Sequence, residues 1–90
     1  MAERRVVIGS SVGLHARPAA LFVQAAGRQP MPVTIGKDGT EPVDARSILM
    51  VLGLDAKNGD EVVLAASGDG ADSTLDELAG LLATDLDAQP

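Results

Sequence analysis

The 90-residue chain contains no cysteine, no tryptophan and no tyrosine, and its only aromatic side chain is Phe22. The absence of cysteine excludes a disulfide scaffold and a thiolate metal site, and it fits a reducing compartment, so we expect a cytoplasmic protein. Without aromatic side chains on which bases could stack, nucleic-acid binding is disfavoured. A net charge of −6 opposes binding to nucleic acid and to anionic membranes as well.

Long apolar runs are also missing, although a membrane span or a signal sequence would need one. The run Val6-Val7-Ile8, which follows a charged N-terminus, is too short for either. Apolar residues still make up 46% of the chain, so we expect one small domain over residues 1–90 with a core of aliphatic side chains. We expect a soluble monomer whose tail is frayed over about residues 85–90.

Hydrophobic periodicity predicts seven elements in the order βαββαβα. Pro18 suits the first turn of the first helix, and Asp38-Gly39 predicts a hairpin. Pro42 cannot donate a ladder hydrogen bond, so the third strand is expected at a sheet edge. The order predicts an α+β domain with an antiparallel sheet and helices on one face. The expected strands are residues 4–8, 33–35, 40–43 and 61–66, and the expected helices are about 19–27, 48–54 and 71–83.

The segment after Ser47 is apolar on every side, and a short helix on a small domain cannot bury all of it. Ser47 is the expected N-cap of this helix. We expect Val51 and Leu54 to be buried. The apolar residues expected to be exposed are Ile48, Leu49, Met50 and Leu52.

His15 is the only histidine, so chemistry that needs an imidazole at neutral pH must use it. It lies at or just before the start of a predicted helix, whose unpaired N–H groups and positive dipole end favour an anion. Arg17 adds a guanidinium that is always charged. A lone histidine before a helix is more often a cap or loop residue. This context instead indicates a histidine that carries a phosphoryl group, held by Arg17 and by the backbone of Ala16 and Arg17.

Other chemistries find little support in the sequence. One histidine without cysteine gives no metal site, and no cofactor motif is present. Ser10 or Ser11 with His15 lacks the spacing of a hydrolytic triad. Gly68-Asp69-Gly70 is not followed by the Lys-Ser/Thr of a phosphate loop and is expected to be a turn. We therefore expect a carrier of a group, not an enzyme.

Two blocks carry a resemblance to a known family. The first is Gly-Leu-His-Ala-Arg-Pro-Ala at residues 13–19. The second is Asp-Ala-Arg-Ser-Ile-Leu at residues 44–49, followed by Leu-Gly-Leu at residues 52–54. With the chain length and the element order, these blocks make the whole chain resemble the HPr family, the histidine-containing phosphocarrier proteins of the bacterial sugar phosphotransferase system.

The resemblance implies a sheet of strand order 1-4-2-3 with three helices on one face. It also implies that His15 accepts a phosphoryl group on Nδ1 from phosphorylated Enzyme I, with Arg17 stabilising the phosphate. The acceptor of the phosphoryl group would be the IIA domain of a sugar permease. Partners would dock on an apolar surface, ringed by Arg17, Arg28 and Arg46, that is formed by Ala16, Ala20, Leu21, Ile48, Leu49 and Leu52.

The resemblance further implies regulatory phosphorylation at Ser47 by an HPr kinase. Members regulated in this way commonly carry Lys where this chain has Arg46, and Met where it has Leu49. Two other readings stay open at this point: a carrier of a specialised or nitrogen-related branch, and a non-enzymatic ligand-binding module in which His15 is structural.

Overall fold

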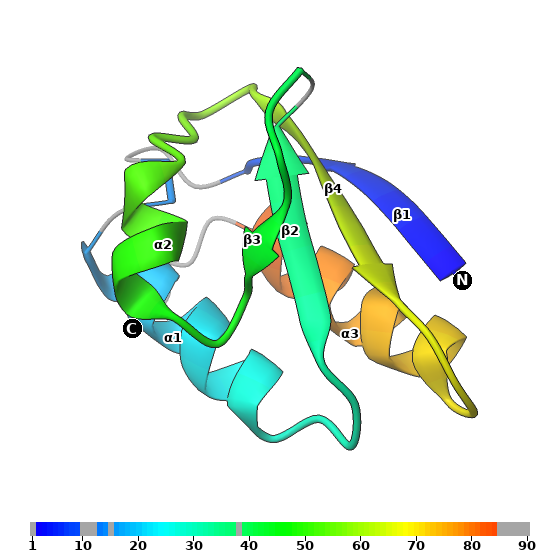
Figure 1. Cartoon of the computed structure of the whole chain (residues 1–90). Helices are drawn as coiled ribbons and strands as arrows, with labels where there is room; N and C mark the ends of the chain where they lie inside the picture. The colour runs from blue at the N-terminus through cyan, green and yellow to red at the C-terminus, as the bar shows by residue number, and fades with distance from the viewer. Residues whose placement is uncertain (1, 10–12, 15, 38, 85–90) are drawn as a thin grey trace.

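The computed structural model describes residues 2–9, 13–14, 16–37 and 39–84, apart from the side chain of Ala16. The sheet is antiparallel with strand order β1-β4-β2-β3. Figure 1 shows α1 and α3 across one face of this sheet, with α2 at its β3 edge. The predicted α+β fold and strand order are confirmed. The elements are β1 (Ala2–Val7), α1 (Ala16–Gly27), β2 (Val33–Lys37), β3 (Val43–Asp44), α2 (Ile48–Gly53), β4 (Glu61–Ala66) and α3 (Ala71–Ala83).

The core lies between the sheet and the helices. Alternation along β4 turns Val62, Leu64 and Ala66 toward the helices. Phe22 on α1 is completely buried, so the one aromatic ring fills the middle of an otherwise aliphatic core. The helix residues that bury the facing stripes at helical spacing are Ala19, Phe22, Ala25 and Ala26 on α1, and Ala71, Leu75, Leu78 and Leu82 on α3.

The third strand differs from its prediction. It spans only Val43–Asp44, not residues 40–43, although it lies at the sheet edge as expected. The Thr40 N–H donates to the Lys37 carbonyl oxygen at 3.1 Å, and the Thr40 hydroxyl donates to the same oxygen at 2.8 Å. These bonds close a turn, and Pro42 has no N–H with which to extend the ladder. Pairing therefore begins only at Val43.

Other boundaries shift by a few residues. β1 begins at Ala2, and α1 begins at Ala16, which leaves Pro18 in the first turn as predicted. Asp38 of the predicted hairpin and the tail 85–90 lie outside the described residues; Gly39 has φ +83° in a turn. Within the described part of the chain, no helix has the length and apolar character that a bilayer span requires.

Polar contacts fix both helices of the main layer. Arg4, on the edge strand β1, donates to Asp76 at 3.0 Å and to Asp72 at 3.3 Å, which ties α3 to the sheet. At the end of α1, Gln29 accepts from the buried Thr74 hydroxyl at 2.9 Å and donates to Glu77 at 2.9 Å. The end of α1 is therefore held against α3.

Asp60, in the turn before β4, should make the free energy of unfolding depend on pH in the acidic range. Its carboxylate accepts from the Lys57 N–H at 2.9 Å and lies 3.4 Å from the Lys37 ammonium. The hydrogen bond from Lys57, with the charges of Lys37 and Lys57, lowers the pKa of Asp60 below its ordinary 3.8. Because the folded-state pKa is the lower one, this stabilisation is complete above the ordinary pKa and is lost as the pH falls through the folded value.

As the pH is lowered from about 5 to about 3, we therefore expect the free energy of unfolding to decrease less steeply in Asp60→Asn than in the wild type. Urea unfolding at several pH values measures this slope. An acid slope in Asp60→Asn equal to that of the wild type would contradict the assignment.

Candidate functional site

The backbone that leads into α1 is anchored tightly. The Leu14 N–H donates to the Ala56 carbonyl oxygen at 2.7 Å, and Leu14 and Pro18 are both buried. Gly13 has φ +76°, and a Cβ there would lie 2.5 Å from the Ala56 oxygen. Only glycine fits both the conformation and the space. His15, between the buried Leu14 and the first residue of α1, lies outside the described residues.

The start of α1 offers backbone donors that the helix itself does not satisfy. By helix geometry, the N–H groups of Ala16 and Arg17 have no carbonyl within the helix to bind, and the missing N–H of Pro18 removes one further donor. The first turn contains no acidic residue. No side-chain carboxylate of that turn therefore competes for these donors, and the positive end of the dipole is available to an anion.

Two arginines on α1 and just beyond its end stand out electrostatically. Arg17 and Arg28 are exposed, and neither forms an ion pair with a carboxylate among the residues described. Arg46, which was expected to ring the site with them, has its guanidinium 3.8 Å from Asp44. The cations that do pair with a described carboxylate are Arg4, Arg5, Lys37, Arg46 and Lys57. Arg17 is thus a cation beside the start of α1 with no described carboxylate to neutralise it.

The short helix α2 exposes most of its apolar residues. Ile48, Leu49 and Met50 are 40%, 79% and 50% exposed, whereas Val51 is completely buried. Leu49 stands about 200° around the helix from Val51, which explains why it is the most exposed. We refer to Ile48, Leu49 and Met50 as the α2 patch.

Two burial predictions for this segment are corrected. Leu52, expected to be exposed, is half-buried and packs against the core. Leu54, expected to be buried, is likewise only half-buried, because α2 ends at Gly53 and Leu54 follows the last helical turn. Both leucines flank the inward-facing Val51, so each shares its surface between core and solvent.

The α2 patch lies near α1, because α1 and α2 pack against each other. In Figure 1 the two helices lie together on the side of the molecule away from β1. Ala20 and Leu21 of α1 are half-buried. Of the six residues predicted for docking, five are therefore partly or largely accessible on this pair of helices, and the side chain of Ala16 lies outside the described residues. Met50, absent from that prediction, belongs with the exposed group.

Ser47 has the geometry of an N-cap, as predicted. Its backbone is extended at φ −100° and ψ 111°, and its hydroxyl oxygen accepts from the Met50 N–H at 3.4 Å. The side chain is half-buried beside the α2 patch. The sequence analysis did not predict the contact of Ala56 with Gly13 and Leu14. These segments lie more than forty residues apart, and no local pattern indicates that they are neighbours in the fold.

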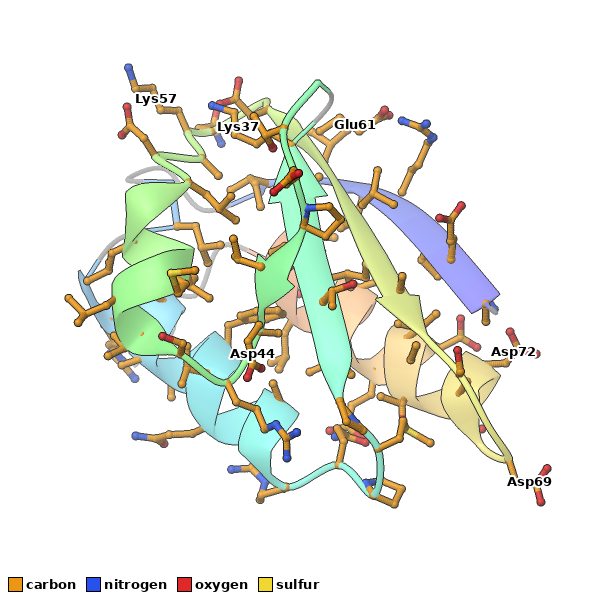
Figure 2. All side chains as sticks on the ribbon, viewed as in Figure 1. Lys37, Asp44, Lys57, Glu61, Asp69 and Asp72 are labelled. Carbon is orange, nitrogen blue, oxygen red and sulfur yellow. The ribbon has the colours of Figure 1, made fainter. Side chains whose placement is uncertain are left out.

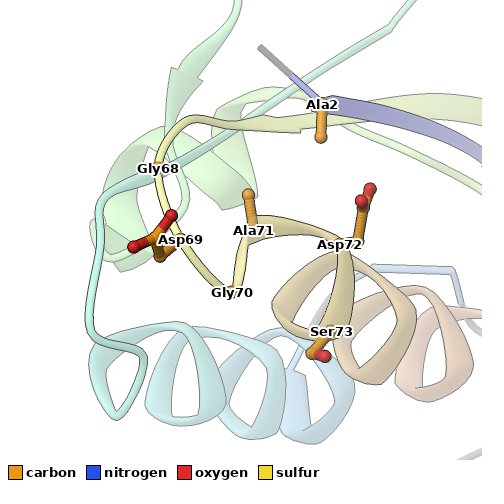
Figure 3. Close-up of a pocket in the computed structure, with 7 residues that line it drawn as sticks. All are labelled: Ala2, Gly68, Asp69, Gly70, Ala71, Asp72 and Ser73. Atoms are coloured by element: carbon orange, nitrogen blue, oxygen red, sulfur yellow. The ribbon is translucent and has the colours of Figure 1, made fainter.

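A wide depression of 690 Å³ lies elsewhere, at the start of α3 (Figure 3). It is lined by the Gly68–Gly70 turn, by Ala2 and by the first residues of α3. Asp69 and Asp72 stand at its rim in Figure 3 and would repel a phosphate. The depression shares no residue with the start of α1, so it is not part of the candidate site.

Comparisons with known proteins agree on one family. A family model described as "PTS HPr component phosphorylation site" matches residues 2–84. The phosphocarrier protein HPr of Streptomyces coelicolor is 52% identical over 90 residues, which are 100% of this chain and 97% of that protein. The solved structure of HPr-C-His from Thermoanaerobacter tengcongensis has a TM-score of 0.89 at 34% identity and covers 100% of both chains. An HPr from Bacillus anthracis has a TM-score of 0.84 at 37% identity, with 90% of this chain and 95% of that chain covered.

The matched residues include the start of α1, where Arg17 has no ion pair with a described carboxylate, and the exposed apolar patch on α2. The chain therefore belongs to the HPr family, the phosphocarriers that pass phosphoryl groups from Enzyme I to IIA domains in the phosphotransferase system and are not themselves catalysts.

Proposed function

We propose that His15 is the residue that carries the phosphoryl group. The observation that supports this most strongly is the start of α1, where the amides of Ala16 and Arg17 lack helix partners directly after the only imidazole in the chain. Family membership removes support from the alternative in which His15 is merely structural.

The transfer needs a neutral imidazole with one unprotonated ring nitrogen. The positive end of α1 and the Arg17 guanidinium both favour the neutral form over the imidazolium. The unprotonated nitrogen, Nδ1 in our assignment, attacks phosphorus. The N–P bond to the histidine of Enzyme I breaks as the new one forms, and no water takes part. The second transfer, to a IIA domain, is the same exchange in the opposite sense.

Arg17 and the first-turn amides would stabilise the phosphorylated form. The phosphoryl group brings close to two negative charges, and each charge-assisted hydrogen bond contributes about 1.5–3 kcal/mol in favourable geometry. Arg17 is exposed, so water screens its attraction. This screening keeps the phosphoryl group transferable, since a carrier that held it too tightly would slow the second step.

Enzyme I and phosphoenolpyruvate provide the test of this proposal. Incubation should place one phosphate on each chain, labile in acid and stable in base, and addition of a IIA domain should remove it. No such label on the wild-type chain would refute the proposal. The rate of transfer to sugar-specific IIA domains is then compared with the rate to nitrogen-related IIA domains. The faster acceptor identifies the branch of the phosphotransferase system in which this carrier works.

We further propose the α2 patch, with Ala20 and Leu21, as the surface on which Enzyme I and the IIA domain alternate. Three exposed apolar side chains on one short helix are unusual for a surface that stays in water. Both partners must reach the same histidine, so one small surface and fast exchange suit the task.

Leu49→Gln should raise the KM of Enzyme I for this protein about tenfold with little change in kcat, because Leu49 is the most exposed member of the patch. Its exposure also means that unfolding should be nearly unaffected. Val7→Gln is the matched control: Val7 is 52% exposed but lies on β1, so its KM should equal that of the wild type. Equal KM values for Leu49→Gln and Val7→Gln would refute the docking assignment.

Ser47 is a second proposed phosphorylation site, with a regulatory role. A phosphate on its hydroxyl would stand at the start of α2, beside Ile48 and Leu49, and would place negative charge within the docking surface. Phosphorylation by an HPr kinase should therefore weaken docking without touching His15. A kinase that labels the wild type but not Ser47→Ala would support this role; no label on either would refute it.

The remaining proposals concern state and place. We propose a cytoplasmic carrier that works as a monomer, because the docking surface must be open to two partners in turn. Some relatives form dimers. Dimeric structures are known for an HPr from Thermoanaerobacter tengcongensis and for Crh from Bacillus subtilis. Sedimentation of the purified chain decides between the two states.

A further inference from the structure

One turn holds both ends of the segment that leads to His15. At the near end, the Ile8 N–H donates to the Asp60 carbonyl oxygen at 2.9 Å, and the Ile8 carbonyl oxygen accepts from the Gly59 N–H at 3.0 Å. At the far end, the Leu14 N–H donates to the Ala56 oxygen at 2.7 Å. Residues 55–60, which we call the anchor turn, thus bind the chain on both sides of residues 9–13.

The two anchored residues are part of the core. Ile8 and Leu14 are each 1% exposed. Asn58 adds a side-chain hydrogen bond to the Ile8 carbonyl oxygen at 3.5 Å. A shift of the anchor turn would therefore move two buried side chains as well as the backbone that enters α1. Because Leu14 is the residue directly before His15, such a shift would also displace the imidazole.

Backbone and side-chain bonds together hold the anchor turn. The Asp60 N–H donates to the Lys57 carbonyl oxygen at 2.9 Å, and the Asp60 carboxylate accepts from the Lys57 N–H at 2.9 Å, which adds a second bond across the same turn. The Lys37 ammonium, from the end of β2, lies 3.4 Å from that carboxylate and donates to the Asp55 carbonyl oxygen at 3.4 Å. Lys37 therefore joins the first and the last residue of the anchor turn.

Asp55 has an uncommon backbone conformation at the start of the anchor turn. It has φ +52°, which makes it the one non-glycine residue with positive φ in the described chain. An L-residue adopts this conformation at a cost, and it persists where surrounding contacts fix it. Here the Lys37 ammonium binds the Asp55 carbonyl, and the Asp55 N–H donates to the Leu52 oxygen at 3.2 Å. Figure 2 shows Lys37 and Lys57 at the same end of the molecule, beside this turn.

We propose that Asp60 and Lys37 are positioning residues for phosphoryl transfer, because they fix the anchor turn that sets both ends of the His15 segment. This inference rests on the proposed role of His15. Their effect would pass through the backbone of Ile8 and Leu14, which the anchor turn binds. They should act on the transfer step and not on docking, because the anchor turn contributes nothing to the α2 patch.

Asp60→Ala tests the proposal by two readouts. Amide hydrogen exchange at Ile8 and Leu14 should become at least about fivefold faster relative to the core amide of Leu64. In the Enzyme I assay, kcat should fall about tenfold while KM stays within about twofold of the wild type. Asp60→Asn keeps an oxygen that can accept the Lys57 N–H and should restore most of kcat. Lys37→Met should also speed amide exchange at Ile8 and Leu14 and lower kcat, each by a smaller factor. This second variant keeps the proposal testable if Asp60→Ala folds poorly.

Asp44→Ala is the matched control. Asp44 also accepts from a backbone N–H in its turn, that of Arg46 at 2.9 Å, and pairs with that arginine, but it stands beside the start of β2. Its loss should leave Ile8 and Leu14 exchange unchanged. A wild-type kcat in Asp60→Ala, with the wild-type chain labelled by Enzyme I, would overturn this inference alone. Absence of label on the wild type would overturn the proposed function, and the exchange rates would then still decide whether the anchor turn holds the segment.

Discussion

His15→Ala should accept no acid-labile phosphate from Enzyme I. The chain has no second histidine and no cysteine, so no other side chain can offer a neutral nitrogen or a thiolate nucleophile at this place. Phosphorylation is followed by radiolabel from phosphoenolpyruvate or by intact mass. The loss should be complete, because alanine removes the atom that forms the bond.

The fold of His15→Ala should remain intact. Leu14 and Pro18, on either side of position 15, are buried in the core, and the substitution leaves both side chains in place. Its urea midpoint should therefore lie close to that of the wild type. Ser47→Ala is the companion variant and should be labelled by Enzyme I at the wild-type level. Acid-labile phosphate on His15→Ala, or its loss in Ser47→Ala, would contradict the assignment of His15.

Gly13→Ala should be strongly destabilising. At φ +76° any L-residue costs about 1–2 kcal/mol, and the new Cβ would lie 2.5 Å from the Ala56 oxygen and 2.8 Å from the Lys57 Cα. Both contacts are to backbone, which cannot move aside without disturbing the anchor turn. We expect a loss of about 2–4 kcal/mol in the free energy of unfolding, measured in urea.

Gly59→Ala separates strain from collision. Gly59 also has positive φ, +89°, but a Cβ there would meet nothing within 4 Å. Its cost should be the conformational part alone, about 1–2 kcal/mol. If Gly13→Ala and Gly59→Ala proved equally stable, the close approach of Gly13 to Ala56 would not be a constraint in solution.

The sequence was sufficient to predict most of the fold, because periodicity and capping are local. Val51 is buried as predicted, Ser47 caps α2, and the strand that follows Pro42 lies at a sheet edge. The errors occur at the ends of elements, which periodicity does not fix to the residue. The third strand is short because Thr40 closes a turn on Lys37, and Leu54 is half-exposed because α2 ends one residue before it.

The candidate site divides in the same way. The residues predicted for chemistry, His15 and Arg17, follow from residue type and from the predicted start of a helix, which the fold bears out at Ala16. The supports of the site could not be predicted, because each joins segments far apart in the chain. Lys37 forms an ion pair with Asp60, although β3 and α2 separate them in the chain. The Ala56 carbonyl oxygen binds the Leu14 N–H from more than forty residues away. Nothing in the local pattern indicates that residues 57–60 bind the segment before α1.

The central claim is that a phosphoryl group on His15 is held by the start of α1. The most direct measurement is heteronuclear NMR of the ¹⁵N-labelled chain before and after phosphorylation by Enzyme I and phosphoenolpyruvate. We expect coupling of phosphorus to the Nδ1 nitrogen of His15, and marked downfield shifts of the Ala16 and Arg17 amide protons as they donate to the phosphate. Phosphorus on any other residue, or Ala16 and Arg17 signals that do not move, would contradict it.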